Sequence, residues 1–347
     1  MIRKTSQSAE EWFHRKATDY VEAQILYHLN RAGLFQELEK GPQSAHDLAT
    51  GLGLVPQVLQ MLLEYLEGVD GLIGRDEEGR FVLTEFGREI LGRFGRPGES
   101  GTTYNFFDVR VGAYGEVWSS LGELLSGEAS YGRDLKREGE RAADAVYTVG
   151  KRLEEGFLQI VDRLGAETAL ELGVTSGLLN ILGQVRPATR LYGVDRSQEV
   201  LDAAEAKARS ESVHGIRWLA GDIFDLEAWV NPALKQQHGV LFTVHFHEFL
   251  AAGTERVQKW LRDLRGELSG WHIVAMEQPR LAAGDRDRVP EVEWLYNHSN
   301  ILIHHLIGNG RILSDTRWRK LFEEADLTLE SVTPMNFLGY QGYVYRL

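Results

Sequence analysis

The sequence contains no cysteine among its 347 residues. A disulfide framework, a thiolate zinc site and a cysteine nucleophile are therefore excluded. It also contains no run of 18 apolar residues, so it predicts no membrane-spanning helix. The first residues, MIRKTSQSAEEWFHRK, are polar and lack the apolar segment that is typical of a signal peptide. We therefore expect a cytoplasmic protein without a membrane partner.

The sequence also has no excess of positive charge. The 38 Lys and Arg residues stand against 51 Asp and Glu residues, which gives a net charge of −13. A nucleic-acid partner or an anionic membrane surface would require a basic surface, so both are disfavoured. The hydrophobic content is 43%, and at this length it is enough for a sizeable core and suggests two domains. An enzyme that acts on a small molecule fits this composition best.

Residues 1–95 have the pattern of helices followed by a short β-ribbon. Ser44 is a plausible helix N-cap, because Asp47 follows three residues later. The stretch LIGRDEEGRFVLTEFG predicts two short strands around a polar turn at residues 77–79. Helix, turn, helix and β-wing together are typical of a winged helix. The second helix carries no Arg or Lys, which argues against DNA binding. Residues 96–150 are expected to form a helical linker that contributes to a substrate pocket.

From residue 151 onward, short apolar runs alternate with helical stretches. Strands are expected at TALEL (168–172), RLYGVD (190–195), IRWLAGD (216–222), GVLFTVHF (239–246) and WHIVAME (271–277), and the C-terminal residues resemble a closing antiparallel pair. This alternation predicts an α/β fold with a parallel sheet covered on both faces. Ligands of such sheets bind beyond the carboxyl ends of the strands.

Polar and glycine residues lie where these strands end. The segment ELGVTSG (171–177) ends the first strand and opens a helix, and its glycines at 173 and 177 allow a tight turn. Asp195 ends the second strand, where an acidic side chain can accept both ribose hydroxyls of an adenosine. Asp222 ends the third strand, where it can reach an adenine edge. The sequence therefore indicates a nucleotide site at this edge of the sheet.

These motifs resemble, in their order, the class I O-methyltransferases that use S-adenosylmethionine (SAM). The matching segments are AGLF (32–35), FVLTEFG (81–87), ELGVTSG, GVD (193–195), AGDIF (220–224), HEF (247–249) and HLIGNGRILSDTRWRKLFEEADL. The resemblance implies a winged-helix dimerisation domain at 1–95, a helical linker at 96–150 and a Rossmann-like catalytic domain at 151–347, in a homodimer. It also implies a SAM pocket formed by Glu171, Gly173, Gly177, Asp195, Asp222 and Phe224. Thr175 departs from the family pattern, which has glycine there, and a β-branched residue is costly wherever φ is positive.

The HEF motif places His247 where plant-type members of this family have their general base. An imidazole with an ordinary pKa near 6.5 can accept a proton from a substrate near neutral pH. Glu277, at the end of the next expected strand, could orient this ring. One hypothesis is therefore a metal-free O-methyltransferase with His247 as its base.

A second hypothesis involves a metal ion. His247 and Glu248, with His298 from a helix 51 residues further on, resemble the ligand set of the metal-dependent α-keto acid C-methyltransferases. Two histidines and one carboxylate suit iron or zinc. This resemblance implies methylation of the β-carbon of an α-keto acid.

Other residues and readings stay open. His245 is expected to share a strand face with His247, as a further ligand, a neighbour of a ligand or a buried polar residue. His304 is expected to pack or to face solvent, and Arg110, Arg133 and Arg311 are equal candidates for binding a substrate carboxylate. Other metal-centred chemistry on a methyltransferase fold, or a non-catalytic binding role, remains an alternative.

Overall fold

The computed structural model describes residues 8–69, 71–94 and 103–347. The chain divides into two compact units: the first comprises Met1–Ala129 and Leu135–Ala145, the second Ser130–Asp134 and Val146–Leu347. Most of the segment expected as a linker, 96–150, contributes to the first unit, and its residues 96–102 lie outside the described ranges. The boundary between the units falls inside one long helix, α9 (Gly139–Leu164).

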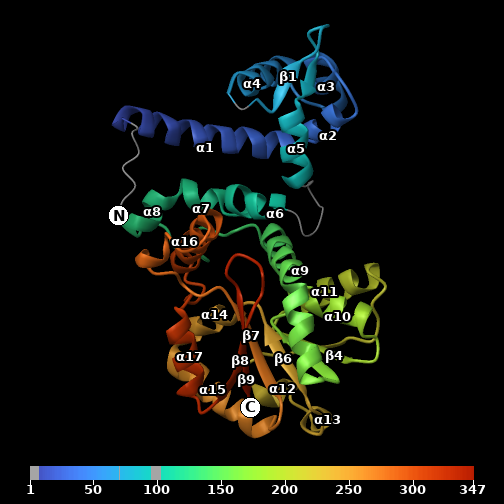
Figure 1. Cartoon of the computed structure of the whole chain (residues 1–347), viewed down its shortest axis with the longest axis vertical. Helices are drawn as coiled ribbons and strands as arrows, with labels where there is room; N and C mark the ends of the chain where they lie inside the picture. The colour runs from blue at the N-terminus through green and yellow to red at the C-terminus, as the bar shows by residue number, and fades with distance from the viewer. Residues whose placement is uncertain (1–7, 70, 95–102) are drawn as a thin grey trace. The chain divides into compact units, whose positions relative to one another are not determined.

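The first unit is mainly helical (Figure 1). Its elements are α1 (Ala9–Arg31), α2 (Leu34–Glu39), α3 (Ala45–Leu52), α4 (Pro56–Val69), β1 (Ile73–Arg75), β2 (Phe81–Leu83), α5 (Glu85–Phe94), α6 (Thr103–Asp108), the π-helical turn η1 (Val109–Ala113), α7 (Gly115–Ser119) and α8 (Leu121–Ser126). The Ser44 side chain accepts a hydrogen bond from the Asp47 N–H, as expected of an N-cap. Strands β1 and β2 pair antiparallel around the predicted polar turn.

The second unit contains a seven-stranded sheet in the order β5-β4-β3-β6-β7-β9-β8. The strands are β3 (Thr168–Leu172), β4 (Arg190–Asp195), β5 (Arg217–Ala220), β6 (Gly239–Thr243), β7 (His272–Glu277), β8 (Thr328–Pro334) and β9 (Gln341–Arg346). The first five pair in parallel, and the last two form the antiparallel pair that the sequence predicted. The α/β fold with a parallel central sheet is confirmed.

Helices cover the sheet of the second unit on both faces. Its helical segments are α10 (Leu178–Val185), α11 (Gln198–Ser210), α12 (Leu226–Trp229), α13 (Pro232–Lys235), α14 (Phe246–Phe249), η2 (Leu250–Ala252), α15 (Thr254–Glu267), η3 (Ala283–Asp285), α16 (Glu291–Leu306) and α17 (Asp315–Glu323). In Figure 1, α10 and α11 lie on one side of the strands, and α15 and α17 lie on the other. Every residue of β3 and of β6 is buried, as expected of central parallel strands.

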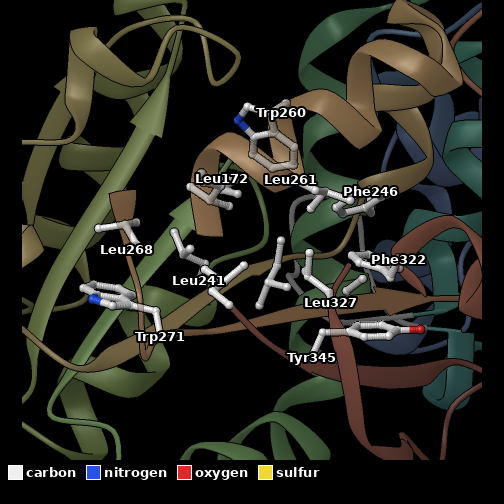
Figure 2. Close-up of a cluster of buried hydrophobic side chains, with 14 of the residues drawn as sticks. Leu172, Leu241, Phe246, Trp260, Leu261, Leu268, Trp271, Phe322, Leu327 and Tyr345 are labelled. Atoms are coloured by element: carbon white, nitrogen blue, oxygen red, sulfur yellow. The ribbon is translucent and has the colours of Figure 1, made fainter. Parts of the chain in front are cut away.

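One face of this sheet carries the larger core cluster, which is shown in Figure 2. Trp260 and Leu261 of α15 and Phe322 of α17 pack there on apolar side chains of the strands. Phe246 enters the same cluster, and its ring centroid lies 4.8 Å from that of Phe322. Burying a phenylalanine side chain contributes about 2 kcal/mol or more. This anchor fixes the start of α14, where the HEF motif lies.

Across the ranges that the structure describes, no helix combines the length and the apolar character needed to cross a membrane.

Candidate active site

The glycine loop lies at the carboxyl end of β3, under helix α9. Gly173 and Gly177 have φ of 75° and 71°, so both positions favour glycine. A Cβ atom on Gly177 would lie 2.2 Å from the Tyr147 ring, and one on Gly150 would lie 1.9 Å from the Ser176 carbonyl oxygen. Helix α9 therefore rests directly on the loop, and glycine permits this close approach.

Thr175 is accommodated without the backbone cost considered above. Within the described ranges, the non-glycine residues with positive φ are Ser212, Asp326, Asn336 and Leu338. The loop thus places a β-branched residue in an ordinary backbone region. Its N–H donates a hydrogen bond to Glu171 Oε1 at 3.4 Å.

Glu171 is a buried carboxyl group that holds this loop together. Its Oε1 accepts hydrogen bonds from the Ser176 N–H at 3.0 Å and from the Ser176 hydroxyl at 2.6 Å. Its Oε2 is buried and has no hydrogen-bond partner among the described residues. Burial raises the pKa of Glu171 to about 7, against the lowering effect of the hydrogen bonds from Ser176 and Thr175.

Asp195 ends β4 beside the loop. Its two carboxylate oxygens accept hydrogen bonds from the N–H groups of Val174, at 3.2 Å, and Ser197, at 2.9 Å. The adjacent strands β3 and β4 therefore bring Glu171 and Asp195 to the same edge of the sheet, as the sequence predicted.

Asp222 and Phe224 follow β5 at the same end of the sheet. Asp222 is exposed and accepts a hydrogen bond from the Phe224 N–H at 3.0 Å. The Phe224 ring packs against Trp260 at 5.6 Å and Phe249 at 6.2 Å, and the Arg256 guanidinium lies over it at 4.8 Å.

The HEF motif departs from the expected strand geometry. Strand β6 ends at Thr243, and His247 belongs to the short helix α14. The prediction that His245 and His247 share a strand face is therefore wrong. The chain turns because the Thr243 hydroxyl accepts the His245 N–H and the His245 carbonyl accepts the Glu248 N–H. The two imidazole rings still lie close together, with centroids 5.6 Å apart.

His247 and Glu277 form a buried pair. The His247 side chain is 3% exposed, and its Nδ1 lies 2.9 Å from Glu277 Oε2 and 3.0 Å from Oε1. The His247 backbone N–H also donates to Glu277 Oε1 at 2.8 Å. A carboxylate can only accept, so in the neutral ring Nδ1 carries the proton and Nε2 has a free lone pair. The Nε2 atom is buried and has no hydrogen-bond partner within the described ranges.

The pKa of His247 reflects two opposing effects. Burial lowers it, because the imidazolium loses its hydration. The charge and hydrogen bond of Glu277, with a further contribution from the charge of Glu248, outweigh this loss and raise the pKa above its ordinary value. A raised pKa makes the neutral ring a stronger base, provided that the pH is high enough to keep it neutral.

His247 and two neighbouring side chains, His245 and Glu248, form a group that could hold a metal ion. Ligand atoms of His245, His247 and Glu248 all lie within 4.8 Å of one another, and this is the one such group found in the described part of the chain. The structure does not bring His298 into the group. The His298 ring is exposed, stacks on Trp294 at 3.9 Å, and has its Nδ1 3.0 Å from the Trp294 carbonyl oxygen. His304, six residues after His298 on α16, lies beside His247 instead, and the centroids of these two rings are 4.3 Å apart.

The turn after α16 also reaches the HEF motif. Asn309 Nδ2 donates to Glu248 Oε1 at 2.6 Å, and the Arg311 N–H donates to the His247 carbonyl at 3.1 Å. Sequence reasoning missed Asn309 and Gly310. The dipeptide Asn-Gly is a turn signal, but nothing local indicates which distant residues such a turn contacts.

The three candidate arginines differ in their surroundings. The Arg133 side chain is 72% exposed and forms an ion pair with Asp134. Arg110 donates to the Phe106 carbonyl oxygen at 3.4 Å. Arg311 is anchored beside His247 through its backbone and has an exposed side chain.

The chain is similar to known methyltransferases over most of its length. It is 31% identical over 322 residues to the 2-ketoarginine methyltransferase of Streptomyces arginensis, covering 87% of this chain and 84% of that one. It is 24% identical to the 3-amino-4-hydroxybenzoate 4-O-methyltransferase of Streptomyces cremeus, covering 96% and 90%. No family model matches the sequence.

Its fold also occurs in solved structures. The structure of human N-acetylserotonin methyltransferase in complex with SAM superposes on this chain with a TM-score of 0.70. The sequence identity is 16%, and the match covers 99% of both chains. The fold is thus shared, and the similarity to the Streptomyces arginensis enzyme extends to the sequence. The chain is a methyltransferase and belongs to the class I SAM-dependent family of the O-methyltransferase type.

Proposed function

We propose that the protein methylates the β-carbon of an α-keto acid, with SAM as the methyl donor. The observation that carries this proposal is the buried His247–Glu277 pair, which leaves an unpartnered Nε2 lone pair beside His245 and Glu248. The 31% identical relative, a 2-ketoarginine methyltransferase, acts on an α-keto acid by its name and supports the same substrate class.

We assign SAM to the carboxyl end of β3 and β4. The buried Glu171 Oε2, which lacks a hydrogen-bond partner in the described ranges, fits a cationic amino group. Asp195 would accept the ribose hydroxyls, Gly173 and Gly177 would allow close approach to the loop backbone, and Asp222 and Phe224 would flank the adenine. When bound, SAM supplies an electrophilic methyl group with a neutral thioether as its leaving group.

The donor set fits a divalent iron or zinc ion. His245 and Glu248 would supply donors, while His247, whose Nδ1 donates to Glu277, would keep its Nε2 lone pair free for proton transfer. The position of His304 against His247 makes His304 a better candidate than His298 for a further ligand from α16. When bound, the ion would act as a Lewis acid that polarises a carbonyl oxygen.

The protein's own contribution is removal of a proton. His247 Nε2 would take a proton from the β-carbon, and Glu277 would stabilise the resulting imidazolium. The β-carbon then forms a bond to the methyl carbon as the methyl–sulfur bond breaks, leaving S-adenosylhomocysteine. His247 afterwards returns its proton to water. Alignment of the carbon with the methyl group accounts for much of the rate, as in other displacement reactions.

Proton exchange tests this function independently of methyl transfer. We expect incubation with α-keto acids in D₂O, without SAM, to exchange the β-hydrogens, and addition of SAM to yield a β-methyl product, both visible by NMR. Treatment with a chelator should abolish both reactions, and added Fe²⁺ or Zn²⁺ should restore them. The proposal fails if no α-keto acid exchanges or is methylated while a phenol or another hydroxyl compound is.

That outcome would favour a second candidate, a metal-free O-methyltransferase in which His247 deprotonates a substrate hydroxyl. The relative from Streptomyces cremeus, an O-methyltransferase by name, supports this alternative. The hydrogen bond between His247 and Glu277 supports it as well, because it orients the base without a metal ion. In this enzyme, a chelator would leave the activity unchanged.

We also propose that the protein is a homodimer formed through its N-terminal unit. Helix α1 exposes Trp12, Phe13 and Tyr20 at 45%, 68% and 63%, and such aromatic side chains are typical of interfaces. Sedimentation equilibrium should give twice the chain mass of 39.2 kDa, and Phe13→Glu should reduce it to one chain. A wild-type mass of 39.2 kDa would contradict the dimer.

A further inference from the structure

The turn between α16 and α17 contacts two parts of the site through its backbone. The Asn309 N–H donates to the His304 carbonyl at 3.0 Å, and the Arg311 N–H donates to the His247 carbonyl at 3.1 Å. Gly310, between them, has a φ of 81°, and a Cβ atom there would lie 1.9 Å from the His247 carbonyl oxygen. The turn is therefore in direct backbone contact with the HEF motif and with the end of α16.

The side chain of Asn309 continues this connection. Its Nδ2 donates to Glu248 Oε1 at 2.6 Å, a short hydrogen bond between two half-buried groups. One carboxylate oxygen of Glu248 lies within 4.8 Å of a ring nitrogen of His245 and of a ring nitrogen of His247. The amide thus engages one carboxylate oxygen and limits the rotation of the group as a whole.

We propose that Asn309 is a positioning residue, which holds the Glu248 carboxylate beside the imidazoles of His245 and His247. This proposal rests on the metal centre of the proposed function. A glutamate has three side-chain torsions, and without the amide bond its carboxylate would leave the donor set for part of the time. Partners that orient a metal-binding carboxylate typically contribute about 10–100-fold in metal affinity.

Metal affinity, measured without any substrate, tests this role. In Asn309→Leu, a side chain of similar size that cannot donate a hydrogen bond replaces the amide. We expect the Kd for Zn²⁺, from competition with a chromogenic chelator, to increase about 10–100-fold. The visible spectrum of the Co²⁺-loaded protein should change in position or intensity, because the carboxylate donor is displaced. Asn309→Gln keeps the donor on a longer chain and should restore part of the affinity.

A matched control is Asn300→Ala, on the same helix as His304, which should keep the wild-type Zn²⁺ affinity and Co²⁺ spectrum. Thermal unfolding of each metal-free variant checks that the fold is retained. If Asn309→Leu binds Zn²⁺ with the wild-type Kd and gives the wild-type Co²⁺ spectrum, Asn309 is not a positioning residue, although the metal centre stands. If the wild-type protein itself binds neither ion, the metal centre and this inference both fail.

Discussion

His247→Ala should lower kcat by about 10³-fold, within the range of 10²–10⁴ that general acid–base catalysis typically contributes. Both proposed reactions need Nε2 to accept a proton, and alanine offers no base in its place. The substitution also leaves the Glu277 carboxylate buried without its partner, so we expect a loss of stability of about 3 kcal/mol or more. Steady-state kinetics below the unfolding temperature would separate the loss of catalysis from the loss of stability.

The pH dependence of the wild-type reaction provides a second measure of the same group. His247 must be neutral to act as a base, and its raised pKa places the acidic limb of the kcat/KM profile above the ordinary histidine value of about 6.5. Glu277→Gln removes the carboxylate charge and should move this limb to lower pH.

Two controls distinguish the base from a structural residue. Calorimetry should show SAM binding to His247→Ala with a nearly unchanged Kd, because the loop at 173–177 does not depend on this ring. His305→Ala, which alters an exposed histidine on α16, should keep the wild-type kcat. If His247→Ala retained full activity as a folded protein, neither proposed mechanism could be correct.

Glu171 should make the ligand-free protein less stable as the pH rises. Its pKa is about 7 in the folded protein, against 4.5 for a free side chain, so the folded state holds this proton more tightly than the unfolded chain does. The free energy of unfolding therefore has its full value below about pH 4.5 and falls as the pH rises through 7. A pKa raised to this extent corresponds to about 3 kcal/mol, an order-of-magnitude figure.

Glu171→Gln is neutral at every pH and should remove this dependence. Its amide would lack an acceptor where Oε2 now lies, so its stability at low pH would fall by about 1–3 kcal/mol. The informative quantity is consequently the difference between the two proteins' unfolding free energies, measured by urea titration at pH 5, 6, 7 and 8. We expect this difference to shrink with rising pH. A constant difference would show that Glu171 does not titrate in this range.

The strands were predictable because their residues are buried on both faces and form short apolar runs. TALEL and RLYGVD occupy β3 and β4 with the bounds expected from the sequence. The end of β6 was not predictable from the same signal. Alternating polar and apolar residues in TVHFHEF favour a strand, but Phe246 packs instead against Trp318 and Phe322 of α17, and the chain turns into α14. A tertiary contact overrode the local pattern.

The histidine site shows the same limit. Its location at the carboxyl end of β6, and the presence of Glu277 at the end of the neighbouring β7, follow from strand order alone. Strand order does not predict which histidine of α16 lies next to His247. His298 and His304 are six residues apart on one helix, and the rotation of that helix decides which of them reaches His247. That rotation depends on contacts such as the turn at Asn309, which lies 61 residues from Glu248 in sequence.

The division of helix α9 between the two units limits how the catalytic unit can be isolated. Residues 139–145 of this helix belong to the first unit. Tyr147 and Gly150, just beyond the boundary, are in close contact with the loop at residues 176–177. A fragment cut at Val146 would convert these residues into a new helix end with four unpaired N–H groups, which fray readily. Its glycine loop would lose firm support even though every loop residue was retained. A truncated enzyme should therefore begin no later than Gly139, so that the loop is still covered by the interior of a helix.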